Sequence, residues 1–183
     1  MPEEQLWTGF FHPGEVVSRL GCGARPGDVV EFGCGYGTFT FPVAAVLVGT
    51  LHALDIDPLM VSWVNRKARG GGQTNIVSVE RDFMAAGTGL GNGSVVHAML
   101  FNILHIEEPE KLLREAWRVL TPGGVASVMH WRSDIPTPRG PPLDIRPSPD
   151  QCRFWAKQAG FTGAREVALG DAAPWHFGLL LEK

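Results

Sequence analysis

Short apolar segments alternate with segments of helical periodicity along most of the chain. Runs of strand length predict five strands, at 28–33, 50–57, 74–82, 91–104 and 125–131. Helical patterns lie between them at 38–49, 58–72 and 107–124. This alternation predicts a parallel sheet with helices on both faces.

The C-terminal part of the chain departs from this alternation. A helix is predicted at 148–161, with Ser148 as its N-cap and Gly160 as its stop. Two strands follow at 163–170 and 175–183 without a helical pattern between them, so we expect them to pair antiparallel at one edge through a tight connection. The predicted fold is therefore α/β, a three-layer Rossmann-like doubly wound sheet that is mostly parallel with an antiparallel C-terminal edge hairpin.

Residues 1–183 are interpreted as a single domain, because no internal repeat or linker divides the chain. Residues 1–26 are expected to form an N-terminal helical segment near the first strand. Aromatic residues of this segment, Trp7, Phe10 and Phe11, are expected either to form a lid or to dock the terminus on the core. Residues 132–149 hold six of the 14 prolines and predict a loop near the active site.

Charge and composition narrow the functional classes. The net charge of −3 argues against a general nucleic-acid binder. No apolar run reaches the roughly 18 residues of a membrane span, and two glutamates stand where a signal peptide would carry positive charge, so we expect a cytoplasmic protein. The three cysteines form no CxxC pair or Cys/His cluster, and no metal site is expected.

The stretch VVEFGCGYGTFT, residues 29–40, places Gly33, Gly35 and Gly37 at a strand-to-helix turn. Glycines there let backbone amides approach a ligand closely, and ligands of doubly wound sheets bind beyond the carboxyl ends of the strands. Asp55 ends the second strand, 22 residues after Gly33, where an acid can accept hydrogen bonds from a ribose. Asp57, before a proline, fits a helix cap instead.

Thr38 stands where the dinucleotide fingerprint GxGxxG has its third glycine, which disfavours NAD. The segments EFGCGYGTFT, ALDIDP, ERDF and LLREAWRVLTPGG together resemble the class I S-adenosylmethionine-dependent methyltransferases, in the small-molecule branch that includes the ubiquinone-biosynthesis type. The resemblance implies S-adenosyl-L-methionine as cofactor and a small-molecule methyl acceptor. The cofactor-binding residues that it implies are Glu31, Gly33, Cys34, Gly35 and Gly37 around the amino acid part, Asp55 and Ile56 at the ribose and adenine, and Asp82 and Phe83 at the adenine.

Asn102, His105 and His130 follow or end the fourth and fifth strands, and they are the candidate catalytic residues on the acceptor side. We rank His130 first, as a general base whose ordinary pKa suits neutral pH. The alternatives are that Asn102 caps a turn and that the histidines are satisfied structural residues. Arginines of the loop, among them Arg139, either bind an anionic substrate or are solvated.

Two rival functions stay open. A non-catalytic cofactor-binding or scaffold protein of the same fold would keep the glycine turn but fill the acceptor pocket with bulky side chains. An NAD-dependent oxidoreductase is the third interpretation.

Overall fold

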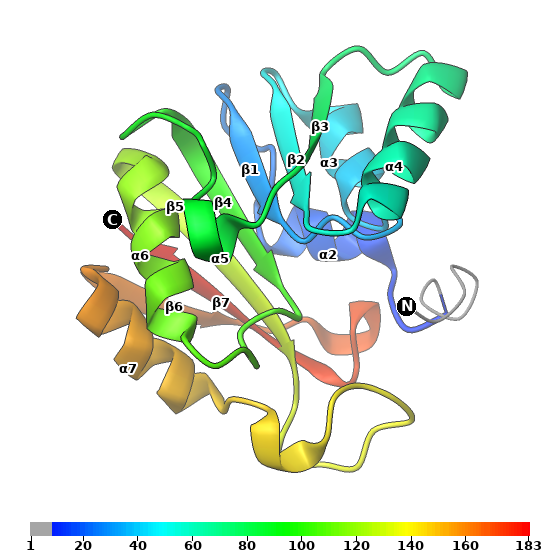
Figure 1. Ribbon diagram of the computed structural model, residues 1–183. Coiled ribbons are helices and arrows are strands. Elements are labelled where there is room, and N and C mark those ends of the chain that lie inside the picture. The colour runs from blue at the N-terminus through cyan, green and yellow to red at the C-terminus, as the bar shows by residue number, and fades with distance from the viewer. Residues whose placement is uncertain (1–8) are drawn as a thin grey trace.

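The computed structural model describes residues 9–183, which form a seven-stranded sheet with helices on both faces (Figure 1). The strands are β1 (Val29–Phe32), β2 (Leu51–Asp55), β3 (Ile76–Glu80), β4 (Val95–Phe101), β5 (Leu120–Trp131), β6 (Gly163–Val167) and β7 (His176–Glu182). The helices are α2 (Pro13–Arg19), α3 (Thr40–Val46), α4 (Pro58–Gly70), α5 (Phe83–Ala86), α6 (Pro109–Val119) and α7 (Pro149–Ala159), with short 3-10 helices η1 (Leu143–Ile145) and η2 (Gly170–Ala172).

The strand order is β3-β2-β1-β4-β5-β7-β6. The first five strands of this order pair in parallel, whereas β7 pairs antiparallel with both β5 and β6. The predicted fold class is therefore confirmed. The chain order reverses between β1 and β4, and a ligand crevice is expected beyond the carboxyl ends of these two strands.

Helices α2, α3 and α4 cover one face of the sheet, and α6 and α7 cover the other (Figure 1). Alternate residues of β1 pack on opposite faces of the sheet. Val30 and Phe32 pack in the core beneath α6 and α7, whereas Val29 packs with α2 and α3. Glu31 shares the face of Val29 by the two-residue period of a strand. A carboxylate is thereby placed inside the apolar layer beneath α3.

Two predicted features of the chain path are wrong. The connection between β6 and β7 is not tight, because residues 168–175 lie between the strands and contain η2. β5 begins at Leu120 rather than at 125, since α6 ends at Val119 and the chain starts to pair with β4 at once. A register shift between Val95 and His97 absorbs the extra residues.

The N-terminal helix of the described chain is α2, and Trp7 lies outside the described residues. Within residues 9–183, every helix is too short or too polar to cross a membrane.

The predicted signals at both ends of α7 are confirmed. The Ser148 hydroxyl accepts a hydrogen bond from the Gln151 backbone N–H at 3.2 Å, and the Gln151 side chain accepts one from the Ser148 N–H at 2.8 Å. This capping box satisfies two N–H groups that the helix leaves unpaired. At the other end, Gly160 has φ of 108°, a conformation that glycine adopts without strain.

Replacing Ser148 with alanine removes the acceptor of this capping box. We expect Ser148→Ala to lower the free energy of unfolding by about 1 kcal/mol, measured by urea denaturation. Ser62→Ala is the matched control, because Ser62 is exposed in the interior of α4 and alanine is the better helix former there. Equal losses in the two variants would contradict a capping role.

Candidate active site

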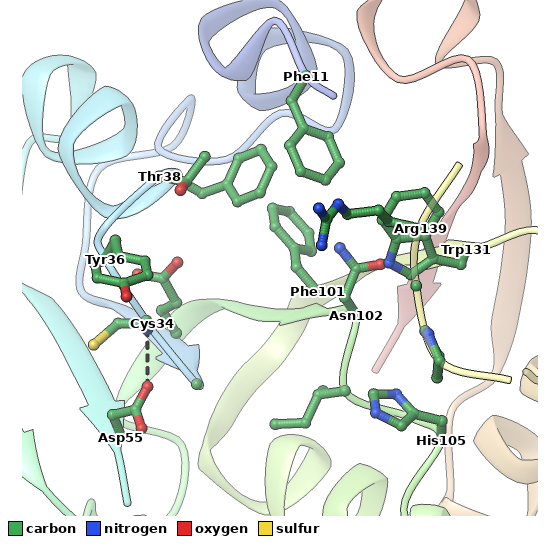
Figure 2. Close-up of a pocket in the computed structure, with 17 residues that line it drawn as sticks. Phe11, Cys34, Tyr36, Thr38, Asp55, Phe101, Asn102, His105, Trp131 and Arg139 are labelled. Carbon is green, nitrogen blue, oxygen red and sulfur yellow. Dashed lines mark hydrogen bonds between the residues drawn. The ribbon is translucent and has the colours of Figure 1, made fainter. Parts of the chain in front are cut away.

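A cavity of about 680 Å³ opens beyond the carboxyl ends of β1 and β4, where the strand order reverses (Figure 2). Its volume is in the range of roughly 300–1,000 Å³ typical of small-molecule sites. The lining comprises Phe11, Glu31, Gly33, Cys34, Gly35, Tyr36, Thr38, Phe39, Asp55, Phe101, Asn102, Ile103, His105, Trp131, Arg139, Gly140 and Pro141. The lining joins the glycine turn to the segments that follow β4 and β5.

The glycine turn is held by the carboxylate that ends β2. The Gly35 backbone N–H donates to Asp55 Oδ2 at 2.8 Å, and the Asp57 N–H donates to Asp55 Oδ1 at 2.9 Å. Gly33, Gly35 and Gly37 all have positive φ, of 77°, 52° and 80°. A side chain at any of these positions would strain the backbone. The three glycines are therefore needed to form the turn itself, as well as to let a ligand approach the backbone.

Asp57 caps α4 as predicted, because its Oδ1 accepts from the Leu59 N–H at 2.9 Å. Asp55, in contrast, faces the cavity while only 9% of its surface is exposed. Each Asp55 oxygen accepts one bond within the protein, and a carboxylate oxygen can accept a second one from a ligand.

Glu31 is a buried carboxylate at the base of the cavity. Its Oε2 accepts from the Thr40 hydroxyl of α3 at 2.5 Å. Burial raises the pKa of Glu31 to about 8, and the negative charge of Asp55 adds to the rise against the opposing effect of the Thr40 hydrogen bond. Glu31 is therefore mostly protonated at neutral pH until a cation lies beside it.

Five of the residues assigned to the cofactor line this cavity, namely Glu31, Gly33, Cys34, Gly35 and Asp55. Burial raises the pKa of the Cys34 thiol, so it stays protonated and acts as a small packing residue. Gly37 lies outside the lining and packs against Phe41.

Ile56, Asp82 and Phe83 also lie outside the lining. Ile56 is 62% exposed at the end of β2. Asp82 caps the short helix α5, accepting from two backbone N–H groups, and Phe83 packs edge-on against Phe32 with ring centroids 5.3 Å apart. Any adenine contact from these residues stays a prediction.

Asn102, directly after β4, lies in the part of the cavity that is the expected acceptor end, and it has an unusual backbone conformation. It is the one non-glycine residue of 9–183 with positive φ, at 55°, and its N–H donates to the Met129 carbonyl at 2.7 Å. Its Oδ1 is buried without a hydrogen-bond partner among the described residues. A strained backbone and an unpaired buried oxygen at one position point to a ligand-binding role.

His105 and His130 form a pair, but they reach the cavity unequally. His105 Nδ1 lies 3.2 Å from His130 Nε2, and His130 Nδ1 lies 3.2 Å from the Trp131 carbonyl. His105 is half-buried and lines the cavity, whereas His130 is fully buried and lies outside the lining. The order of preference therefore changes, with His105 placed to touch a ligand and His130 placed to support it.

The proton positions in this pair follow from the carbonyl. A carbonyl only accepts, so His130 Nδ1 carries the hydrogen and its Nε2 is the acceptor for His105 Nδ1–H. Burial lowers the pKa of His130 to about 4, which keeps it neutral, and burial also lowers the pKa of His105. His105 Nε2 is left with a lone pair that can take a proton.

Aromatic residues form much of the acceptor end, and sequence reasoning singled out few of them. Phe11 packs edge-on against Phe39 at 5.2 Å, and Phe39 packs against Phe101 at 4.9 Å. Phe11 is 6% exposed, so it both docks the N-terminal segment and lines the cavity. Tyr36, Thr38 and Phe39 belong to the same segment as the glycines. This segment is a turn without a regular period, so the sequence does not predict which of their side chains face the cavity.

Within residues 9–183, no group of three or more histidine, cysteine or acidic side chains is arranged to hold a metal ion.

Solved structures of the same fold include several methyltransferases. An S-adenosylmethionine-dependent methyltransferase from Aquifex aeolicus has a TM-score of 0.83 at 21% identity, with 98% of this chain and 93% of that chain covered. A putative type 11 methyltransferase from Sulfolobus solfataricus has 0.75 at 22% identity, covering 95% and 93%. The cyclase SpnF has 0.72 at 16% identity, covering 92% and 80%. At these identities the likeness establishes the fold alone.

A search of curated protein sequences gave no match. The family model described as "Methyltransferase domain" matches residues 29–124, just over half of the chain. This range runs from β1 through the glycine turn and Asp55 to the segment TPGG at the start of β5. The chain therefore belongs to the methyltransferase-domain family.

Proposed function

We propose that this protein is an S-adenosylmethionine-dependent methyltransferase for a small-molecule acceptor, with residues 1–183 acting as a single domain. The observation that carries the proposal is one continuous cavity, which joins the glycine turn held by Asp55 to an acceptor end with His105. The family match supports methyl transfer, and the name of the Aquifex aeolicus protein supports the cofactor.

The residues of the glycine-turn end fit this cofactor. Two carboxylates, Glu31 and Asp55, line the cavity there, which suits a ligand with an ammonium, a sulfonium and ribose hydroxyls. When bound, S-adenosylmethionine supplies an activated methyl group on a positive sulfur. The protein then has to orient the acceptor in line with that methyl group and exclude water.

His105 and His130 are placed to assist a methyl acceptor whose reacting oxygen or nitrogen carries a proton. His105 Nε2 takes the proton from the hydroxyl or amine as the acceptor oxygen or nitrogen forms its bond to the methyl carbon. The imidazolium at His105 still donates through Nδ1 to the neutral His130 Nε2, and a charge-assisted bond is stronger than the neutral bond that it replaces. His130 is thus a positioning residue, and its own Nδ1–H is held by the Trp131 carbonyl.

The two rival functions make different demands on the cavity. A binding-only protein would need no room beyond the glycine turn, yet the cavity extends past Asn102 to Arg139. An NAD enzyme would need a third glycine where Thr38 lines the cavity. A cyclase of the same fold is known in SpnF, so formation of methylated product is the decisive measurement.

S-adenosylmethionine and S-adenosylhomocysteine are expected to bind in calorimetry, and NAD is not. Gly35→Val should abolish this binding, because Gly35 has φ of 52° and its N–H bonds Asp55 within the cavity wall. Gly70→Val is the control, since a side chain added at Gly70 meets nothing within 4 Å. Tighter binding of NAD than of S-adenosylhomocysteine would exclude the proposed cofactor.

Binding of S-adenosylhomocysteine at pH 7 is expected to release a proton. Glu31 has a raised pKa of about 8, so it is protonated before binding and ionises when the ligand ammonium arrives. Calorimetry in two buffers of different ionisation enthalpy should give about one proton released per ligand bound. Glu31→Gln cannot ionise and should release none, so equal release by Glu31→Gln would show that another group loses the proton.

His105→Ala is expected to lower kcat by about 10²- to 10⁴-fold if the acceptor carries a proton, with S-adenosylhomocysteine affinity unchanged. Because the pKa of His105 is lowered from its ordinary value, wild-type activity should persist at pH 6.5 and fall only at more acidic pH, as the base becomes protonated.

His130 variants separate positioning from catalysis. His130→Leu removes the acceptor for His105 Nδ1–H and should shift the acid limb of the kcat–pH profile. His130→Gln keeps an acceptor oxygen near the place of Nε2 and should restore much of the profile. Normal turnover of both His105→Ala and His130→Leu would mean that the protein acts by positioning the acceptor alone.

A further inference from the structure

The acceptor end of the cavity carries a cation with no counter-ion. Arg139 lines the cavity, and Figure 2 shows its side chain on the same side of the cavity as Asn102 and Trp131. Among the described residues, Arg139 forms no ion pair. Arg132, on the same loop, is paired with Asp134 through two bonds of 2.9 and 2.7 Å. Arg139 is therefore the loop arginine placed to meet a ligand.

The backbone that carries Arg139 is held in place by a second arginine. Arg146 is only 8% exposed, and its guanidinium donates to the carbonyls of Arg132, Arg139 and Pro141 and to the Thr137 hydroxyl. The bonds to Pro141 and Thr137 are both 2.7 Å. One buried side chain thus ties both sides of the loop together and holds the backbone that carries Arg139.

Close packing adds to this restraint. Gly140 follows Arg139 with φ of 113°, and a Cβ there would lie 2.9 Å from the Trp131 ring. Only glycine, which has no Cβ, lets the backbone approach the indole so closely. Arg146 lies on the same indole, with Cζ 5.8 Å from the ring centroid.

The surroundings of Arg139 indicate what kind of molecule it would bind. Phe11, Phe39, Phe101 and Trp131 give this end an aromatic, apolar wall. Among the described lining residues, the two acids are Glu31 in β1 and Asp55 at the end of β2, on the side of the glycine turn. Arg139 is an exposed cation next to this apolar wall, and both acids of the described lining lie at the far end. This arrangement suits an apolar ligand with one anionic group.

We propose, on the basis of the function proposed above, that the methyl acceptor is a small apolar molecule bearing one oxyacid anion, a carboxylate or a phosphate monoester, bound by Arg139. Arg146 is a positioning residue for this interaction.

The experiment is a screen for product with S-adenosylmethionine labelled at the methyl group. Three matched libraries are used: aromatic and aliphatic carboxylates with a hydroxyl or amine, the corresponding phosphate monoesters, and the corresponding neutral carboxamides. Methylated product is expected from one of the two anionic libraries, and which one responds distinguishes carboxylate from phosphate. The matched carboxamide should be turned over with at least tenfold lower kcat/KM.

Arg139→Gln tests the assigned residue, and Arg132→Gln is the matched control on the same loop. Arg139→Gln should lower kcat/KM for the anionic acceptor roughly 10- to 100-fold, mainly through KM, because hydrogen bonds to charged groups are the stronger ones. Its affinity for S-adenosylhomocysteine should stay within twofold of the wild type. Arg132→Gln should leave both quantities unchanged.

The outcomes separate this inference from the function on which it rests. Failure to bind S-adenosylhomocysteine would overturn the proposed function. If S-adenosylhomocysteine binds, the anionic acceptor is overturned by product from the neutral library alone, by no product from any library, or by an Arg139→Gln variant that turns over the anionic acceptor normally.

Discussion

The bond between the Gly35 backbone N–H and the Asp55 carboxylate is the interaction on which the site depends. It connects the turn after β1 to the end of β2, so two strands adjacent in the sheet share one rigid corner. The glycines supply the positive φ values that the corner needs, and Asp55 supplies the acceptor that makes this conformation the stable one. The turn and the end of β2 together form one side of the cavity wall.

The two ends of the cavity differ in the charge of the side chains that line them. Carboxylates at Glu31 and Asp55 favour a cation at the glycine turn, whereas the opposite end has Arg139, an aromatic wall and His105, which contacts the buried neutral His130. The raised pKa of Glu31 shows that holding a bare carboxylate there is unfavourable in the free protein. A cationic ligand relieves that cost, so the buried acid selects for positive charge more sharply than an exposed one would.

The alternation of strand and helix patterns allowed the fold to be predicted. Local rules about one turn or one helix end allowed the glycine turn and the caps at Asp57 and Ser148 to be predicted, whereas the contact of Asp55 with a ribose stays a prediction. The sequence could not show which of His105 and His130 lines the cavity. His105 follows β4 and His130 lies near the end of β5, and only the packed structure tells which one is covered. The aromatic wall was missed for the same reason, since Phe39 and Phe101 are far apart in sequence and meet only across β1 and β4.

This difference in predictability follows from how the two ends are built. The cofactor end uses strand termini, whose positions are set by sheet hydrogen bonds shared with neighbouring strands. The acceptor end uses residues 102–105 and the loop 132–146, which are not strands of the sheet. The Arg146 side chain holds the loop, and one backbone hydrogen bond from the Asn102 N–H holds the start of the other segment. Replacements in those segments can change which acceptor fits without disturbing the corner at Asp55. In the proposed function, acceptor choice therefore depends on these loops, whereas the cofactor site depends on the strand ends of the sheet.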